Sequence, residues 1–202
     1  MPVRTSYTQG TPNWVDLQTP DQDAAKPFYS GLFGWTYDDQ PMPEGQVYSM
    51  AMLGEYAVAA IAPQPPEMVA AGAPPMWNTY LAVDSADDAA AKAEAAGGTI
   101  AMAPFDVMDA GGWPSSSTRP ARPWRCGRQM VGGTTPPQMP GTPSHWHVYF
   151  GVADADATVA EATELGGSAL VPPFDTPVGR MAVIGDPQGG VFSIIQQAPQ
   201  PA

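Results

Sequence analysis

The chain has 202 residues, of which 44% are hydrophobic, so it can bury the core of one large domain or two small ones. Acidic residues outnumber basic ones by 20 to 8 and the formal net charge is −12, which argues against binding to nucleic acids or to anionic membranes. The sequence has no apolar run near the length of a membrane span, no signal-peptide core at its N-terminus and one cysteine, Cys126, so we expect a cytoplasmic protein.

The first 63 residues predict a βαβββ module, which is a strand, a helix and three further strands. After a strand at 14–21, residues 22–35 form an amphipathic pattern with Phe28, Tyr29, Leu32 and Phe33 on the apolar side. Because proline favours the first helical position, Pro27 predicts that this helix begins near Lys26. Three strands of a meander follow at 36–40, 46–53 and 56–63, and residues 64–76 read by composition as a Pro/Ala linker.

Two later stretches are copies of one unit, residues 77–106 and residues 146–175. The shared residues include Trp77 with Trp146, Tyr80 with Tyr149, and Pro104–Phe105–Asp106 with Pro173–Phe174–Asp175. Each copy predicts a short strand, an Ala-rich helix that a Gly-Gly pair ends, and a return strand. Only the second copy continues into two apolar strands, at 179–187 and 189–197, around the turn Asp186-Pro187-Gln188-Gly189.

Residues 112–129 interrupt the first copy where the repeat predicts two apolar strands. This segment has three prolines and four of the chain's eight basic residues, a composition that cannot form a half-buried strand pair. Read in a shifted frame with GC-rich codons, it would encode both strands and an Asp-Pro-x-Gly turn, which supports a frameshift as a hypothesis. The alternative is a genuine Pro/Arg-rich surface insertion.

A further fragment, residues 130–137, resembles the strand at 56–63 and suggests a parent of four modules. The predicted organisation is module one at 1–63, the linker at 64–76, a truncated module two at 77–111, an irregular segment at 112–143 that holds the remnant strand, and module four at 144–198. Module one could pair with module four, or two chains could share modules in a homodimer.

The opening segment 14–35 and the closing segment 178–196, with its Asp-Pro-x-Gly turn, are similar to the vicinal oxygen chelate superfamily. That superfamily includes glyoxalase I, bleomycin-resistance proteins and extradiol dioxygenases, and the chain resembles in particular the two-domain glyoxalase-like or "hydroxylase" proteins of high-GC bacteria. The resemblance implies an α+β fold in which βαβββ modules form a curled, mixed β-sheet cup with helices on the outer face. It also implies a ligand, and often a divalent metal, inside the cup.

In metal-dependent relatives the ligands come from the first and last strands of paired modules. In this chain those positions fall on Trp14, Asn78, His147 and Ser193, of which only His147 is a good ligand. His145 and His147 would lie on one face of a strand, but no acidic ligand is placed to join them. We therefore expect no tightly held metal, with a divalent metal as the alternative.

The candidate ligand pocket follows from strand alternation and from the resemblance. Trp14, Asp16 and Gln18 share one strand face, so Asp16 would orient or deprotonate a ligand if that face lines the cup, and would meet solvent if it does not. The predicted pocket residues are Trp14, Asp16, Gln18, Asn78, Tyr80, His147, Tyr149 and Ser193.

We expect a protein that binds a small aromatic or apolar molecule without a metal, since aromatic residues would line the pocket. One alternative is a divalent-metal-dependent lyase or dioxygenase of the same superfamily. Another is a rearranged product that has kept the fold and lost the function. The sequence identifies no catalytic residue.

Overall fold

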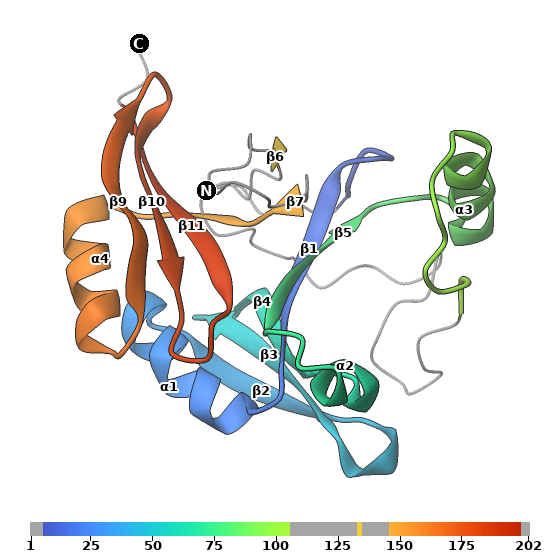
Figure 1. The fold of residues 1–202 in the computed structure, drawn as a ribbon, viewed down its shortest axis with the longest axis horizontal. Coiled ribbons are helices and arrows are strands. Elements are labelled where there is room, and N and C mark those ends of the chain that lie inside the picture. The colour runs from blue at the N-terminus through green and yellow to red at the C-terminus, as the bar shows by residue number, and fades with distance from the viewer. Residues whose placement is uncertain (1–5, 106–132, 135–145, 199–202) are drawn as a thin grey trace.

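The computed structural model describes residues 6–105, 133–134 and 146–198 (Figure 1). The frameshift hypothesis for 112–129 and most of the remnant strand at 130–137 therefore lie outside the described residues. Within the described part no helix is long and apolar enough to cross a membrane.

Module one forms a sheet with a helix packed on one face. Its elements are β1 (Pro12–Thr19), α1 (Gln22–Phe33), β2 (Thr36–Pro41), the 3-10 turn η1 (Pro43–Gly45), β3 (Val47–Leu53) and β4 (Tyr56–Pro63). They are followed by α2 (Pro66–Ala70), β5 (Met76–Leu81) and α3 (Ala86–Ala95). The sheet, called sheet one, has the order β2-β3-β4-β1-β5, with β1 parallel to β4 and antiparallel to β5.

Module four repeats the topology of module one. Its elements are β8 (Tyr149–Gly151), α4 (Ala155–Glu164), β9 (Ser168–Thr176), β10 (Gly179–Gly185) and β11 (Val191–Gln197). They form sheet two, in the order β8-β11-β10-β9, with β8 parallel to β11 as β1 is to β4. Two short strands, β6 (Gly133–Thr134) and β7 (Trp146–His147), pair beside it. The α+β class with mixed sheets is confirmed, and the sheets of the described part do not close into a barrel.

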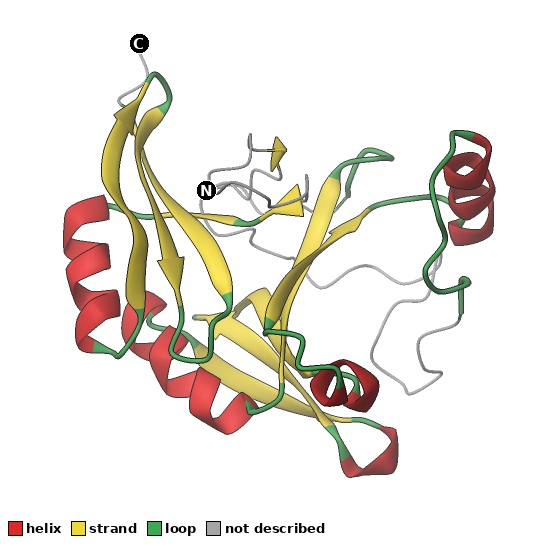
Figure 2. Cartoon of the chain, in the orientation of Figure 1, coloured by secondary structure: helices red, strands yellow, loops and turns green. Residues whose placement is uncertain are grey.

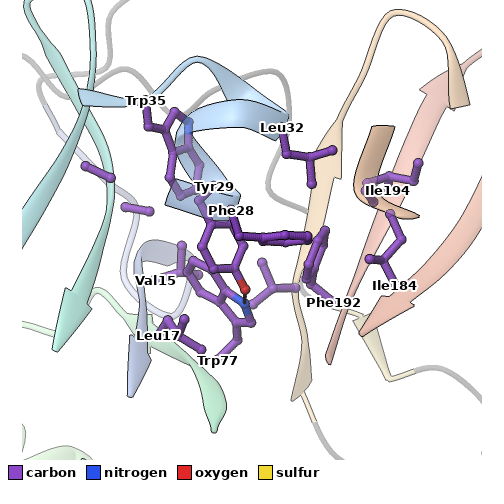
Figure 3. Close-up of a cluster of buried hydrophobic side chains, with 14 of the residues drawn as sticks. Val15, Leu17, Phe28, Tyr29, Leu32, Trp35, Trp77, Ile184, Phe192 and Ile194 are labelled. Carbon is purple, nitrogen blue, oxygen red and sulfur yellow. Dashed lines mark hydrogen bonds between the residues drawn. The ribbon is translucent and has the colours of Figure 1, made fainter. Parts of the chain in front are cut away.

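One hydrophobic core joins module one to module four, and α1 is at its centre (Figure 3). Tyr29 of α1 is fully buried and stacks on Trp35 at 5.7 Å, while its ring meets Phe192 of β11 at the same distance. The Tyr29 hydroxyl donates a hydrogen bond of 2.8 Å to Asp186 in the Asp-Pro-x-Gly turn. The apolar side predicted for α1 therefore packs against both sheets.

The prediction that α1 begins near Lys26 is wrong, because the helix begins at Gln22 and contains Pro27. The Asp21 side chain caps the helix by accepting a hydrogen bond of 3.0 Å from the Ala24 amide. Pro27 has no amide hydrogen, so one intrahelical hydrogen bond is lost, the one to the backbone carbonyl of Asp23. Asp23 lies on the exposed side of the helix, since its side chain is 97% exposed. The cap therefore decides where the helix starts.

The helix of module two, α3, does not pack into the core. No residue of α3 is buried, whereas α4, the equivalent helix of module four, buries Ala155 and Ala162. In the view of Figure 2, α3 lies to one side, away from the strands of both sheets. The return strand predicted after α3 is also wrong, since residues 98–105 form no strand. In module four the corresponding β9 pairs with β10, and no described strand offers module two such a partner.

Candidate functional site

The residues predicted for the first strand lie on the face of sheet one that points away from α1, called here the far face. Val15 and Leu17 of β1 point into the core with α1, so Trp14, Asp16 and Gln18 point to the far face. The register of β1 with β5 places Asn78 opposite Asp16 and Tyr80 opposite Trp14. Strand pairing thus gathers on one face residues that are more than 60 positions apart in the chain.

Asp16 is the centre of a hydrogen-bonded cluster, although it is only 2% exposed. Its Oδ2 accepts hydrogen bonds from the hydroxyls of Tyr80 at 2.9 Å and Tyr48 at 3.0 Å, and its Oδ1 accepts one from Asn78 Nδ2 at 3.0 Å. The indole of Trp14 donates to the Tyr48 hydroxyl at 2.8 Å. We call these five residues, Trp14, Asp16, Tyr48, Asn78 and Tyr80, the Asp16 cluster.

Tyr48 belongs to β3 and reaches Asp16 across β4. The intervening strand carries small side chains, and Ala60 is aligned with Asp16 on one side and with Met50 on the other. A larger residue at position 60 would fill the space over which the tyrosine ring extends. The sequence analysis did not predict Tyr48 as a site residue. Alternation along β3 could have indicated it, because Tyr48 lies two residues before Met50 and therefore on the same face of the strand.

Burial sets the protonation of the Asp16 cluster. It raises the pKa of Asp16 above the usual aspartate range, because desolvation of the carboxylate outweighs the hydrogen bonds from Asn78, Tyr80 and Tyr48. Burial also raises the pKa of Tyr48 and of Tyr80, and the nearby carboxylate adds to both shifts. Both phenols therefore stay protonated at neutral pH and act as donors.

Replacing Asp16 by asparagine is expected to alter how stability depends on pH. Because the folded-state pKa of Asp16 is raised, the stability that its protonated form provides is present below the unfolded pKa and is lost as the pH rises through the folded pKa. The Asp16→Asn variant has no such loss. As the pH rises from the unfolded-state pKa of Asp16 through its folded-state pKa, the free energy of unfolding of the variant should therefore rise relative to that of the wild type.

Urea unfolding at a series of pH values measures this difference. The control is Asp23→Asn, which removes the same charge from a side chain that is 97% exposed. A gap between Asp16→Asn and wild type that stays constant with pH would contradict the role assigned to burial.

The remaining predicted residues form a second group in module four. His147 Nε2 lies 2.9 Å from Ser193 Oγ, and the Tyr149 ring meets the His147 ring edge-on at 5.3 Å. All three side chains are buried, and Tyr149 is aligned with Ser193 in the β8–β11 pair. The first- and last-strand positions of module four are therefore in contact. Gln18 lies on the far face beyond Asp16 and is aligned with Met76.

At the positions where metal ligands were expected, the described residues offer few donors for a divalent metal. His147 lies as many residues before its helix cap Asp154 as Trp14 does before Asp21, so the equivalent pair in module one is Trp14 with Ala60. The pair in module four, His147 and Ser193, offers an imidazole and a hydroxyl. The pair in module one, Trp14 and Ala60, offers no usable metal ligand. The described residues contain no group of three or more His, Cys, Asp or Glu that could hold a metal ion, and His145 lies outside them.

Comparison with known proteins identifies the family. The model of the glyoxalase/bleomycin resistance protein/dioxygenase superfamily matches residues 11–113, and that of a glyoxalase-like domain matches residues 108–195. The chain belongs to this superfamily. CFP32 of Mycobacterium bovis, a candidate glyoxylase, is 44% identical to this chain. The alignment covers 99% of this chain and 100% of CFP32.

Two other similar proteins come from Streptomyces. The anthracycline biosynthesis protein DnrV of Streptomyces peucetius is 31% identical, over 95% of each chain. Among solved structures, the antibiotic-binding protein TnmS3 of a Streptomyces strain matches with a TM-score of 0.43 and 17% identity, over 91% of this chain and 92% of that one. That last similarity is too low to carry an argument.

This chain is shorter than its relatives. The alignment with CFP32 runs over 261 positions and this chain has 202 residues, so at least 59 aligned positions have no residue here.

Proposed function

We propose that this protein binds a small, planar aromatic molecule on the far face of sheet one, without a tightly held metal, and that Asp16 holds a polar group of the ligand. The observation that carries the proposal is the Asp16 cluster itself. A buried carboxylate costs free energy, and three side chains, Tyr48, Asn78 and Tyr80, donate hydrogen bonds to that of Asp16, while Trp14 donates one to Tyr48.

The cluster has the chemistry of a binding site for a hydroxylated ring. An ionised carboxylate has about four acceptor positions, and Tyr48, Asn78 and Tyr80 occupy three of those of Asp16. One position is left for a ligand hydroxyl. Trp14 and Met50 are buried beside the carboxylate, where they would offer a bound ring apolar contact, and Tyr80, which is 44% exposed, is the most exposed member of the cluster.

The relatives support this ligand class. A protein of anthracycline biosynthesis is among them, and polycyclic, hydroxylated aromatic molecules fit a face that combines an indole, two phenols and a carboxylate. Metal-dependent lyase or dioxygenase chemistry is the weaker candidate, because His147 and Ser193 supply too few ligands.

Titration of the tryptophan fluorescence with a hydroxylated anthraquinone tests the proposal. We expect saturable quenching, and about tenfold or greater weakening in Asp16→Asn, because a hydrogen bond to a charged group contributes about 1.5–3 kcal/mol. The matched charge control is Asp23→Asn, which should bind like the wild type. Anthraquinone without hydroxyl groups should bind more weakly than the hydroxylated form.

Metal analysis of the purified protein decides between the two candidates. We expect no stoichiometric divalent ion and no change of ligand affinity in a chelator. One tightly bound divalent ion per chain, or loss of binding in the chelator, would overturn the metal-independent proposal.

A further inference from the structure

The Asp16 carboxylate is covered in the structure, although a ligand must reach it. Asp16 is 2% exposed, and the hydroxyls of Tyr48 and Tyr80 both donate hydrogen bonds to its Oδ2, at 3.0 and 2.9 Å. A ligand hydroxyl can therefore bond to this carboxylate only if a neighbouring side chain moves. The side chain that moves controls access to the site.

Tyr48 is held from two sides. Its hydroxyl donates to Asp16 and accepts a hydrogen bond of 2.8 Å from the indole of Trp14, which is only 9% exposed. Rotation of Tyr48 would break both bonds and would take this acceptor away from a largely buried N–H group, which is unfavourable. Tyr48 is therefore the fixed donor of the two phenols.

Tyr80 is held less firmly at the same oxygen. Its side chain is 44% exposed, and among the described residues its hydroxyl makes one hydrogen bond, the one to Asp16. The equivalent residue of the repeat, Tyr149 in module four, is only 6% exposed, so the exposure of Tyr80 comes from its place in the fold and not from its residue type. Exposed side chains change rotamer rapidly, so Tyr80 is the donor that can leave Asp16 most easily.

The backbone around Tyr80 is anchored, so only the side chain needs to move. Within β5, Tyr80 is aligned with Trp14 of β1. Just beyond the strand, the Ala82 amide donates to the Thr11 carbonyl at 2.9 Å, and the Ala82 carbonyl accepts from the Gly10 amide at 2.7 Å. The Tyr80 ring can therefore rotate outward while the strand pairing stays in place.

We propose, on the basis of the proposed function, that Tyr80 is a movable cover of the Asp16 carboxylate. When a hydroxylated ring binds, the Tyr80 side chain rotates away, and the ligand hydroxyl takes the acceptor position that it leaves on Oδ2. For a phenolic ligand this exchange is close to neutral, because one hydrogen bond from a phenol to a carboxylate replaces another. An aromatic molecule without a donor would leave the position empty, so the cover selects for phenols.

Removal of the Tyr80 hydroxyl should strengthen ligand binding, a gain that structural damage does not produce. In Tyr80→Phe the ring remains, but no hydroxyl competes with the ligand for Asp16. We expect the affinity for a hydroxylated anthraquinone, measured by tryptophan fluorescence, to rise about tenfold, since hydrogen bonds to charged groups are strong enough for such a change.

The matched control is Tyr48→Phe, which removes the other phenol hydroxyl from the same oxygen of Asp16. It leaves the cover in place and deprives the Trp14 indole of this acceptor, so it should bind no more tightly than the wild type. Equal gains in Tyr80→Phe and Tyr48→Phe would show simple competition for the carboxylate and would overturn the cover.

A double-mutant cycle shows whether the gain depends on the carboxylate. In the Asp16→Asn background, Tyr80→Phe should change the affinity by less than about threefold, because a neutral amide oxygen accepts a weaker hydrogen bond than a carboxylate does. A gain of the same size with and without the carboxylate would contradict the proposal.

Urea unfolding without ligand gives an independent test. Tyr80→Phe should lower the urea midpoint less than Tyr48→Phe does, because Tyr80 is the more exposed donor and Tyr48→Phe also affects the bond to Trp14. An equal or larger loss in Tyr80→Phe would show that Tyr80 is a fixed part of the Asp16 cluster, and the cover would be wrong.

Binding by Asp16→Asn separates failure of the ligand site from failure of the cover. If this variant binds the hydroxylated anthraquinone like the wild type, the site at Asp16 is wrong and the cover falls with it. If it binds more weakly while Tyr80→Phe binds no more tightly than the wild type, the site stands and the cover alone is overturned.

Discussion

Replacing Phe192 by alanine is expected to lower the free energy of unfolding by about 3–5 kcal/mol, the usual cost of deleting a buried aromatic ring. Phe192 is 0% exposed and lies where the two modules meet. Its ring centroid is 5.6 Å from that of Phe150 within module four and 6.0 Å from that of Phe33 in α1. The cavity would therefore weaken the packing of both modules at once.

Urea unfolding followed by circular dichroism and by tryptophan fluorescence measures this effect. Both probes should report one transition, at a lower urea midpoint in the variant. The matched control is Phe105→Ala, which removes the same ring from a position that is 67% exposed and should change stability by less than about 0.5 kcal/mol. Two separate transitions in the wild type would contradict a shared core, and would favour a rearranged chain whose modules no longer fold together.

A proline placed in α4 should be far more damaging than one placed at the matching position of α3. Ala91 and Ala160 occupy equivalent positions of the repeat, counted from the caps Ser85 and Asp154, and both are exposed. Proline inside a helix costs about 3 kcal/mol or more. In α4 this cost lowers global stability, because Ala155 and Ala162 bind the helix to the core.

In α3 the same change should melt the helix alone, since no residue of α3 is buried. We expect Ala91→Pro to reduce the helical signal in circular dichroism and to shift the global free energy of unfolding by less than about 0.5 kcal/mol. Ala160→Pro should lower it by about 3 kcal/mol or more. Equal losses in the two variants would show that α3 belongs to the cooperative core, and would contradict the view that module two is incomplete.

Local patterns in the sequence predicted the elements that have partners within their own module. Alternation on β1 placed Trp14, Asp16 and Gln18 on one face, and the structure has that arrangement. The apolar side predicted for α1 packs in the core. These features depend on periodicity and caps, which are properties of short stretches.

Features that depend on distant parts of the chain were not predictable in the same way. Tyr48 reaches Asp16 only because β3, β4 and β1 are neighbours in the sheet and Ala60 is small. The return strand after α3 had a strand-like sequence, but a strand needs a partner for its backbone hydrogen bonds. The position of Pro27 did not indicate the helix start, because the cap at Asp21 has more influence on where the helix begins.

The most direct test of ligand binding on the far face is the NMR spectrum of the tryptophan indole groups. The chain has six tryptophans, and single Trp→Phe variants assign the resonances of Trp14, which is bonded to Tyr48, and of Trp77, which is bonded to Tyr29 in the core. On titration with a hydroxylated anthraquinone, we expect the Trp14 indole resonance to shift in a saturable way and the Trp77 resonance to stay in place. A saturable shift of Trp77 with Trp14 unmoved, or no shift of either, would contradict a ligand site at Asp16.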